Sequence, residues 1–239
     1  MSRVDQILVS VMTGNRGGVS LPEILCAAGT RALSISGAGM ALMSEEGHAG
    51  VVAATDGAAR VMEDLQFTLG EGPCLDASRS GRPVLQPALA ETGPARWPGF
   101  GPGALDAGIR AIFALPLQVG AISLGVLDLY RSSPGTLDEG QLIEALAFAD
   151  AATVILLHLQ DQTAPGEALH PQLSDPLGSR VEIHQATGMI AVQAAVGLAE
   201  ALLLLRAHAF AAERTALETA RDVLARRLRF HPEDSHHEQ

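Results

Sequence analysis

The polar residues of the last third of the chain, residues 177–230, are suited to contacting a polyanion. Residues 174–230 contain seven arginines against six acidic residues, whereas the whole chain has a formal net charge of −11. Most of the other polar residues in this segment are histidine, glutamine or threonine. Guanidinium groups bind phosphate through paired hydrogen bonds and also stack on flat rings. A locally non-acidic segment in an acidic chain predicts that this end meets a polyanion and that the rest has another role.

A second group of residues that could do chemistry lies in the stretch Gly70–Ala77. Gly72-Pro73 indicates the start of a helix, which would put Cys74 at the second helical position, where the helix dipole favours a thiolate. The alternative, which the residue type favours, is an inert buried thiol that packs as a small hydrophobe. Glu71 and Asp76 could approach a ligand or could cap local structure. Cys74, Glu71 and Asp76 are therefore the candidate ligand-binding residues of the first part of the chain.

Catalytic motifs are not found. The sequence has no phosphate-binding glycine loop, no serine in a nucleophile elbow, and no His/Cys spacing typical of a metal site. The histidines of the tail, His231 and His236-His237, could bind a metal weakly, but a disordered polar end is the favoured interpretation. We expect a protein that is not an enzyme, with no catalytic residue and no metal site. The sequence does not identify a cofactor.

Composition predicts two domains in a reducing compartment. The chain has 239 residues, 47% of them hydrophobic, which exceeds the usual size of one domain and supplies a packed core. Cys26 and Cys74 are too few for a disulfide framework. No apolar run reaches the roughly 20 residues of a membrane span, and the N-terminus lacks the pattern of a signal peptide. We therefore expect a cytoplasmic protein with no membrane partner.

Periodicity predicts an α+β first domain over residues 1–160. Helical spacing covers Val4–Met12, Leu21–Leu33 and Leu137 to about Gln160, the last with Thr136 as its cap. Strand-like runs cover Gly39–Met43, Ala49–Ala54, Ala111–Gln118 and Ala121–Tyr130. Two strand pairs joined by short turns favour an antiparallel sheet, flanked by helices.

The rest of the chain is predicted to be helical after a proline-containing linker, residues 161–176. Three helices follow over residues 177–230: one from Ser174 or Ser179 to about Gly197, one over Leu198–Ala211, and one over Glu213–Arg229. Such helices form a small all-α bundle. The run Leu202–Leu205 is too wide for one buried face and indicates a second contact surface, such as that of a dimer. Residues 231–239 are predicted to be a disordered tail.

The first domain resembles a GAF domain. The likeness rests on Leu69–Ala77, on Gly81-Arg82-Pro83-Val84, on Arg96–Phe100 and on the strand Gly125–Tyr130. It implies a sensory fold that holds a small molecule or cofactor, or that serves in dimerisation. Ligands differ widely among GAF domains, so the resemblance implies a pocket without naming its ligand.

The three-helix segment resembles an ANTAR domain, on the block Arg180–Ile190 together with Glu200-Ala201, Leu204–Arg206, Ala209 and Ala220–Val223. The resemblance implies a homodimeric regulator that binds paired stem-loops in nascent RNA and prevents a terminator from forming. Arginine can stack on unpaired bases and pair with phosphates, and glutamine or histidine can bind base edges. The candidate RNA-binding residues are Arg180, His184, Gln185, Thr187, Arg206, Arg214 and Arg221. Where this chain has Thr187, the family commonly has a lysine, which puts one phosphate contact in doubt.

One alternative function remains open. The helical segment could be a protein-interaction or dimerisation module with no direct RNA binding, as the leucine run, Thr187 and the near-neutral charge would allow. A DNA-binding helix-turn-helix fits three helices, but this segment lacks a recognition helix dense in arginine.

Overall fold

The computed structural model describes residues 1–14, 18–44, 47–163, 170–173, 179–212 and 214–231. It divides into two compact units, which we describe separately. The first unit comprises Met1–Gln66 and Gly70–Ser174, and the second comprises Phe67–Leu69 and Asp175–Gln239.

The first unit is built on a five-stranded antiparallel sheet in the order β2-β1-β5-β4-β3. Its strands are β1 (Gly37–Ser44), β2 (Gly47–Ala54), β3 (Val84–Gln86), β4 (Ala111–Val119) and β5 (Ile122–Arg131). The four strands predicted from the sequence correspond to β1, β2, β4 and β5, and the short edge strand β3 was not predicted. The predicted α+β sheet flanked by helices is confirmed.

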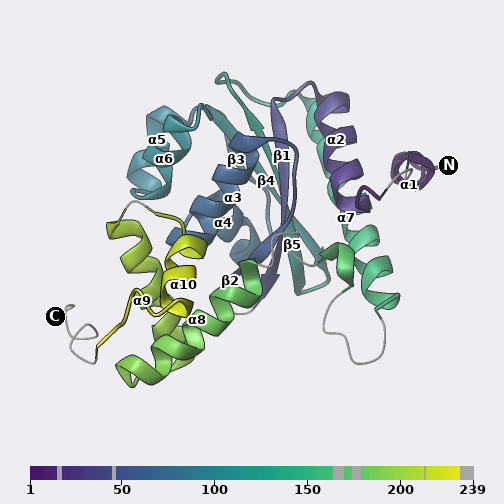
Figure 1. The fold of residues 1–239 in the computed structure, drawn as a ribbon. Helices are drawn as coiled ribbons and strands as arrows, with labels where there is room; N and C mark the ends of the chain where they lie inside the picture. Colours follow the sequence, from purple (N-terminus) through teal and green to yellow (C-terminus); the bar gives the residue numbers. More distant parts are fainter. Residues whose placement is uncertain (15–17, 45–46, 164–169, 174–178, 213, 232–239) are drawn as a thin grey trace. The chain divides into compact units, whose positions relative to one another are not determined.

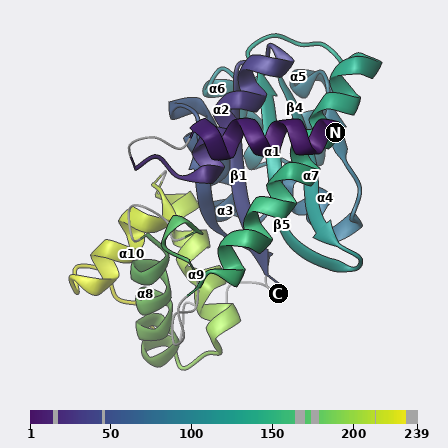
Figure 2. The same ribbon diagram turned by 90° about the vertical axis from the view of Figure 1, so that its right-hand side faces the viewer.

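Helices cover both faces of this sheet (Figures 1 and 2). One face carries α1 (Arg3–Gly14), α2 (Leu21–Leu33) and α7 (Glu139–Asp161). The other carries α3 (Gly57–Leu69), α4 (Pro73–Ser80), α5 (Leu89–Arg96) and α6 (Phe100–Asp106). Of this second layer, the sequence indicated only the start of α4.

Alternation along the central strands separates two environments. Ala38, Met40 and Leu42 of β1 join the hydrophobic core that the sheet forms with α1, α2 and α7. Because successive strand residues face opposite sides, Gly39, Ala41 and Met43 face α3 and α4. On β5 the same rule puts Leu127 and Leu129 in the first core and Asp128 on the α3–α4 face. A single acidic residue in a buried strand therefore lies under α3 and α4.

The cap of α7 differs from the prediction. Asp138, and not Thr136, precedes the helix, and its side chain accepts a hydrogen bond from the backbone N–H of Gln141. The Gln141 side chain in turn accepts from the backbone N–H of Asp138, which completes a capping box two residues later than predicted.

The hydropathy of α7 follows from its position in the core. By length and composition, α7 is the one described helix that could cross a membrane; α8 and α9 would pass only if counted together despite a bend of 103°. Nine residues of α7 are buried, including Phe148, Ile155 and Leu159, and they pack in the core against the sheet, α1 and α2.

After α7, part of the predicted linker packs on the first unit. Pro171–Leu173 form a 3₁₀ turn, η1, in which Leu173 is buried in the core and the Gln172 side chain accepts a hydrogen bond from the backbone N–H of Leu21. Residues 164–169 and 174–178 of the linker, and 232–239 of the tail, lie outside the described residues.

The second unit contains three helices, α8 (Ser179–Ala194), α9 (Leu198–Ala211) and α10 (Ala216–Leu224). They share a core of Ile183, Ala186, Ile190, Ala201, Leu205, Ala220 and Val223, with further small residues around them. The third helix is shorter than predicted, because Arg226 adopts a left-handed backbone with φ of 58°. α8 also ends earlier than the predicted position near Gly197, because Ala195 has a left-handed φ of 58°. The predicted helices in the C-terminal region are confirmed.

Candidate functional site

Four polar side chains lie completely buried between the sheet and the helices α3 and α4. Glu63 and Gln66 come from α3, Cys74 from α4 and Asp128 from β5, and all four are 0% exposed. We call them the buried polar cluster. Buried polar groups are expensive unless they are hydrogen-bonded or bind something, so four of them together mark a candidate functional site.

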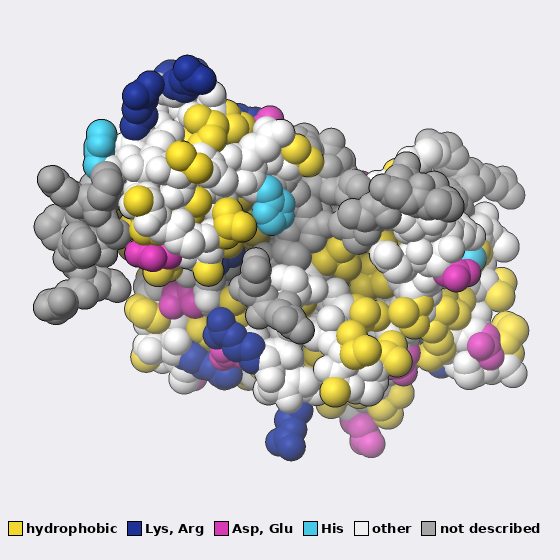
Figure 3. All heavy atoms as spheres, turned by 90° about the horizontal axis from the view of Figure 1, so that it is seen from below, with side chains coloured by type: hydrophobic (Ala, Val, Ile, Leu, Met, Phe, Trp, Pro, Cys, Tyr) yellow, Lys and Arg dark blue, Asp and Glu magenta, His cyan; other side chains and the backbone are white. Residues whose placement is uncertain are grey.

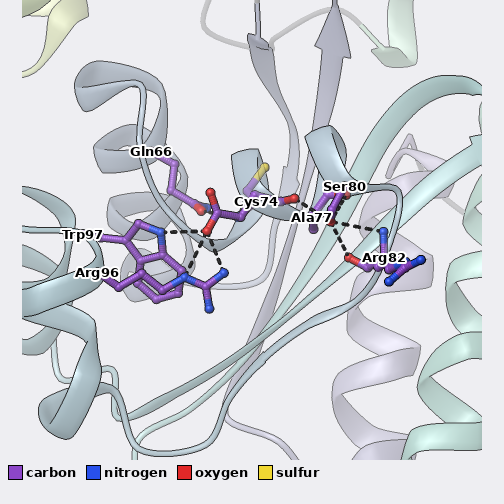
Figure 4. A network of polar contacts seen from close by, with 8 residues as sticks. Gln66, Cys74, Ala77, Ser80, Arg82, Arg96 and Trp97 are labelled. Carbon is purple, nitrogen blue, oxygen red and sulfur yellow. Dashed lines mark hydrogen bonds and ion pairs between the residues drawn. The ribbon is translucent and has the colours of Figure 1, made fainter.

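Gln66 connects the members of this cluster. Its side-chain oxygen accepts a hydrogen bond of 2.7 Å from the backbone N–H of Cys74, and its side-chain nitrogen donates to Asp128 Oδ2 at 3.2 Å. Figure 4 shows the Gln66 side chain extended from its helix toward Cys74 at the start of α4. Gln66 thus caps the first turn of α4 and holds the Asp128 carboxyl at the same time.

Two glycines provide the space for these side chains. A Cβ atom at Gly39, which pairs with Asp128 across β1 and β5, would overlap the Glu63 carboxyl group. A Cβ at Gly72 would lie 2.7 Å from Gln66 Oε1, and Gly72 also has φ of 134°. Glycine inside a strand often marks a place where another group approaches the backbone closely. The backbone is therefore shaped to admit Glu63 and Gln66.

Burial determines the ionisation of the cluster. Desolvation raises the pKa of Glu63 to about 8, against a smaller opposing effect of its hydrogen bond with Asp128. Burial also raises the pKa of the Cys74 thiol well above its usual value, and the nearby Asp128 and Glu63 carboxyls raise it further. Glu63 and Cys74 therefore hold their protons at neutral pH when nothing is bound.

The same residues form a compact set of metal-ligating atoms. One ligand atom each from Glu63, Cys74 and Asp128 lies within 4.8 Å of the other two. The thioether of Met43 lies beside them, with its Sδ 3.8 Å from Cys74 Sγ. No His/Cys spacing in the sequence indicated this set, because its members are far apart along the chain.

Of the three candidate residues predicted here, Cys74 belongs to the cluster and the other two have structural contacts. When nothing is bound, burial raises the pKa of the Cys74 thiol well above its usual value, which favours the protonated, buried thiol over a free thiolate. Glu71 Oε1 accepts hydrogen bonds from the backbone N–H groups of Gly99 and Phe100, at 2.6 and 2.7 Å, where α6 begins.

Asp76, on α4, contacts residues at the end of α5. Its Oδ2 accepts from Arg96 Nη2 at 2.8 Å and from Trp97 Nε1 at 3.2 Å. The Arg96 guanidinium also lies over the Trp97 ring, 4.6 Å from its centroid. These contacts account for Glu71 and Asp76 without a ligand.

Sequence reasoning missed Glu63, Gln66 and Asp128. Asp128 was visible as the single acid in the apolar strand 125–130. For α3, Asp56 caps the helix start and Gly70 its end, so the helix could have been predicted. Glu63 and Gln66 would then have fallen on the same face as the buried Ala59 and Met62.

In the second unit, the candidate RNA-binding residues do not share one environment. His184 and Gln185 are exposed on α8. Arg180 is the second residue of the same helix, and its side chain lies outside the described part of the structure. Arg206 is partly buried on α9.

Thr187 does not lie on the exposed face. It is only 5% exposed, and its hydroxyl donates to the backbone carbonyl of Ile183 at 2.8 Å. The prediction that Thr187 faces RNA is therefore wrong: at a core position, a threonine can satisfy its hydroxyl within its own helix, where a lysine would have to bury a charge.

Two of the candidate arginines bind acidic side chains of the same unit. Arg214 pairs with Asp222, and Arg221 Nε donates to Glu182 Oε2 at 2.7 Å. Both pairs are at the surface and contribute little to stability, so the arginines can exchange these partners for a phosphate at small cost.

An open groove of about 700 Å³ runs along α8 beside the residues that follow α10. Its lining includes the apolar residues Met189, Val192 and Leu224 and the polar residues Gln185, Gln193, Arg226 and Arg229. Gly188 also lines the groove, and a Cβ there would meet no atom within 4 Å. The groove brings Gln185 next to two exposed arginines that sequence reasoning did not select.

Comparison with known proteins identifies the first unit. The family model described as GAF domain matches residues 20–156, more than half of the chain. No curated protein matches the chain.

One solved structure supports the GAF fold, and two others with lower scores are also similar. The GAF domain from an Acinetobacter phosphoenolpyruvate-protein phosphotransferase is 12% identical, covers 69% of this chain and 99% of its own, and superposes with a TM-score of 0.51. The corresponding domain from Coxiella burnetii is 12% identical, with 67% and 96% covered and a TM-score of 0.49. A sensor histidine kinase domain from Sinorhizobium meliloti 1021 is 20% identical, with 59% and 91% covered and a TM-score of 0.48.

The family match covers the sheet, the helices α3 and α4 and the buried polar cluster between them. It ends before α8, so it does not extend to the helices that resemble an ANTAR domain. A GAF domain is a small-molecule sensing or dimerisation module. The chain belongs to the GAF domain family.

Proposed function

We propose that this protein is a sensory transcription regulator, in which the GAF unit receives a signal and the second unit binds RNA to prevent termination. The observation that carries the RNA half is the groove along α8. Gln185 lies in that groove with Arg226 and Arg229, and His184 is exposed on the same helix. The ANTAR-like block Arg180–Ile190 forms α8 itself.

The chemistry of the groove suits an unpaired base. Apolar side chains of the lining, such as Met189 and Leu224, can cover the face of a base, while the Gln185 amide can bind its edge. The guanidinium groups of Arg226 and Arg229 can pair with the flanking phosphates. Of the arginines predicted from the sequence, Arg214 and Arg221 remain in the proposal as phosphate contacts reached after partner exchange.

The experiment is a gel-shift titration of the full chain with RNA carrying two short stem-loops. We expect binding that weakens steeply as salt rises, because phosphate contacts release counterions. Arg226→Gln with Arg229→Gln should weaken binding at least about tenfold and flatten the salt dependence. Arg227→Gln is the control for loss of a nearby charge, since Arg227 is also exposed but is not among the residues that line the groove. Equal effects of the two sets, or no binding at all, would reject the RNA proposal.

A second candidate function is a protein-interaction module. Val192, Leu198, Leu203 and Phe210 are large hydrophobic residues that are more than half exposed on α8 and α9. Contiguous exposed apolar residues are typical of interaction surfaces. If this candidate is right, Leu203→Asp abolishes regulation in cells, and the pair Arg226→Gln with Arg229→Gln leaves it intact.

We also propose that two copies pair through α7 of the GAF unit. Ile143, Leu146, Val154 and Leu157 are between 41% and 61% exposed and recur at spacings that put them on one side of the helix. In Figure 3, hydrophobic side chains gather in the right-hand part of the view, on the side of the GAF unit where α7 lies in Figure 1. This proposal places the protein in the cytoplasm, where its RNA target is made, and includes no catalytic step.

A further inference from the structure

We propose that Glu63, Cys74 and Asp128 form a binding site for a divalent transition-metal ion of the zinc or ferrous iron type. This inference names the ligand class of the GAF unit and is independent of RNA binding by the second unit. It begins with the geometry of three side chains that the fold brings together from α3, α4 and β5.

The distances suit one ion. The three ligand atoms lie within 4.8 Å of one another. A tetrahedral ion with bonds of about 2.0 Å to oxygen and 2.3 Å to sulfur keeps such atoms roughly 3.5 Å apart. Small side-chain movements toward a common centre are therefore enough to ligate an ion, and no backbone rearrangement is needed.

The donor types select the class of metal. A thiolate disfavours magnesium and calcium, which prefer oxygen ligands, and two carboxylates disfavour copper(I). One sulfur and two oxygens suit a borderline ion such as Zn²⁺ or Fe²⁺. The Met43 thioether, 3.8 Å from Cys74 Sγ, is near enough to become a fourth ligand or to close the site.

The residues around the three ligands, which are not ligands themselves, are also arranged to hold them in place. Gly39 has no Cβ where one would overlap the Glu63 carboxyl, and Gly72 makes the same allowance for Gln66. Gln66 then fixes Asp128 through its side-chain nitrogen, as a neighbour that orients a metal ligand does. An ordinary apolar core would be better packed with alanine at Gly39 and a hydrophobic residue at position 63.

A bound ion lowers the net negative charge of the three deprotonated ligands. Three deprotonated ligands carry −3, and a divalent ion reduces this to −1, less than a zinc site of four thiolates carries.

Cobalt(II) is the probe for the test, because it replaces zinc and its bond to a thiolate gives a charge-transfer absorption in the near ultraviolet. The full chain is freed of metal with a chelator, dialysed and titrated with Co²⁺. We expect about one Co²⁺ per chain, a thiolate charge-transfer band, and visible bands of a low-symmetry site. Zn²⁺ should then displace the cobalt and raise the melting temperature.

The two buried cysteines supply a matched pair of variants. Cys74→Ala should lose the charge-transfer band, and Cys26→Ala, equally buried but outside the cluster, should keep it. Glu63→Gln should weaken Co²⁺ binding at least about a hundredfold. Substitution of His236 and His237 by alanine controls for weak binding to the tail, which gives no thiolate band.

The outcomes are distinct. No charge-transfer band in the unaltered chain, or an equal band in Cys74→Ala and Cys26→Ala, overturns the proposal and leaves the cluster as a set of groups that share protons. If Cys74→Ala fails to fold, Glu63→Gln decides, since it changes one atom and should fold. Failure here leaves the gel-shift test of the second unit untouched, and the reverse also holds.

Discussion

At the residue scale, Glu63 and Gly39 depend on each other. The Glu63 carboxyl occupies the place where a side chain at position 39 would begin. These two residues are 24 positions apart in the chain, yet Glu63 can be buried there only because Gly39 has no Cβ atom.

Gly39→Ala tests this coupling. We expect a loss of about 1–3 kcal/mol in the free energy of unfolding, because Glu63 must move out of a packed site to make room. Gly57→Ala is the control, since a Cβ at that helix start meets nothing within 4 Å. Urea denaturation measures both, and equal stabilities would contradict the coupling.

Glu63 also predicts a pH dependence of stability in the metal-free protein. The folded state holds the Glu63 proton up to about pH 8, whereas an unperturbed glutamic acid has a pKa of 4.5. Between these values the folded state binds more protons than the unfolded state, so the free energy of unfolding falls as the pH rises. The contribution is complete below about pH 4.5 and is lost by about pH 8.

Urea denaturation in the presence of a chelator, at several pH values across that window, measures the effect. Each pKa unit corresponds to about 1.4 kcal/mol, so the total is a few kcal/mol at most. Glu63→Gln should flatten the slope, while Glu91→Gln, at an exposed position, should retain it. The same slope in both variants would assign the effect to other groups.

At the scale of elements, short polar contacts determine where the helices begin. Gln66 caps α4, Glu71 binds the first backbone N–H groups of α6, and Asp138 caps α7. Because α4 and α6 are short helices, such a contact is a larger part of their stability than it is in a long helix such as α7.

The cap of α7 gives a direct prediction. Asp138→Ala should lower the free energy of unfolding by about 1 kcal/mol, because the first turn loses a side-chain acceptor. Thr136→Ala should change it by less than half as much, since only the Thr136 backbone carbonyl is used, by Arg131. Thermal unfolding of the two variants compares them, and a larger effect at Thr136 would contradict the observed capping box.

At the scale of the whole molecule, α7 has two roles. Its buried face completes the core of the GAF unit, and its exposed apolar residues form the proposed contact with a second copy. Ile143→Glu with Leu157→Glu should convert a dimer to a monomer, since burying two carboxylates in an apolar interface is costly.

Light scattering after size exclusion measures the mass. Val61→Glu, on α3 and 42% exposed, serves as the control and should leave the assembly unchanged. A monomeric unaltered chain, or a dimer that survives both substitutions on α7, would show that the exposed residues of α7 have another use.

The sequence by itself determined the pattern of the elements. Alternation and helical spacing are local properties, so they predicted β1, β2, β4, β5, α1, α2, α7 and the helical second unit, and the motif around Gly70–Ala77 pointed to the GAF family. Short helices such as α5 and α6 have too few residues for a period to stand out, and they were missed.

Only the tertiary structure decided what the side chains do. It buried Thr187, which the sequence placed among RNA contacts, and it gave Glu71 and Asp76 partners within the domain. It also brought Glu63, Cys74 and Asp128 into one site. The physical reason is that burial and proximity depend on how a helix packs against a strand 54 or more residues away in the chain. The local spacing of residue types does not determine that packing.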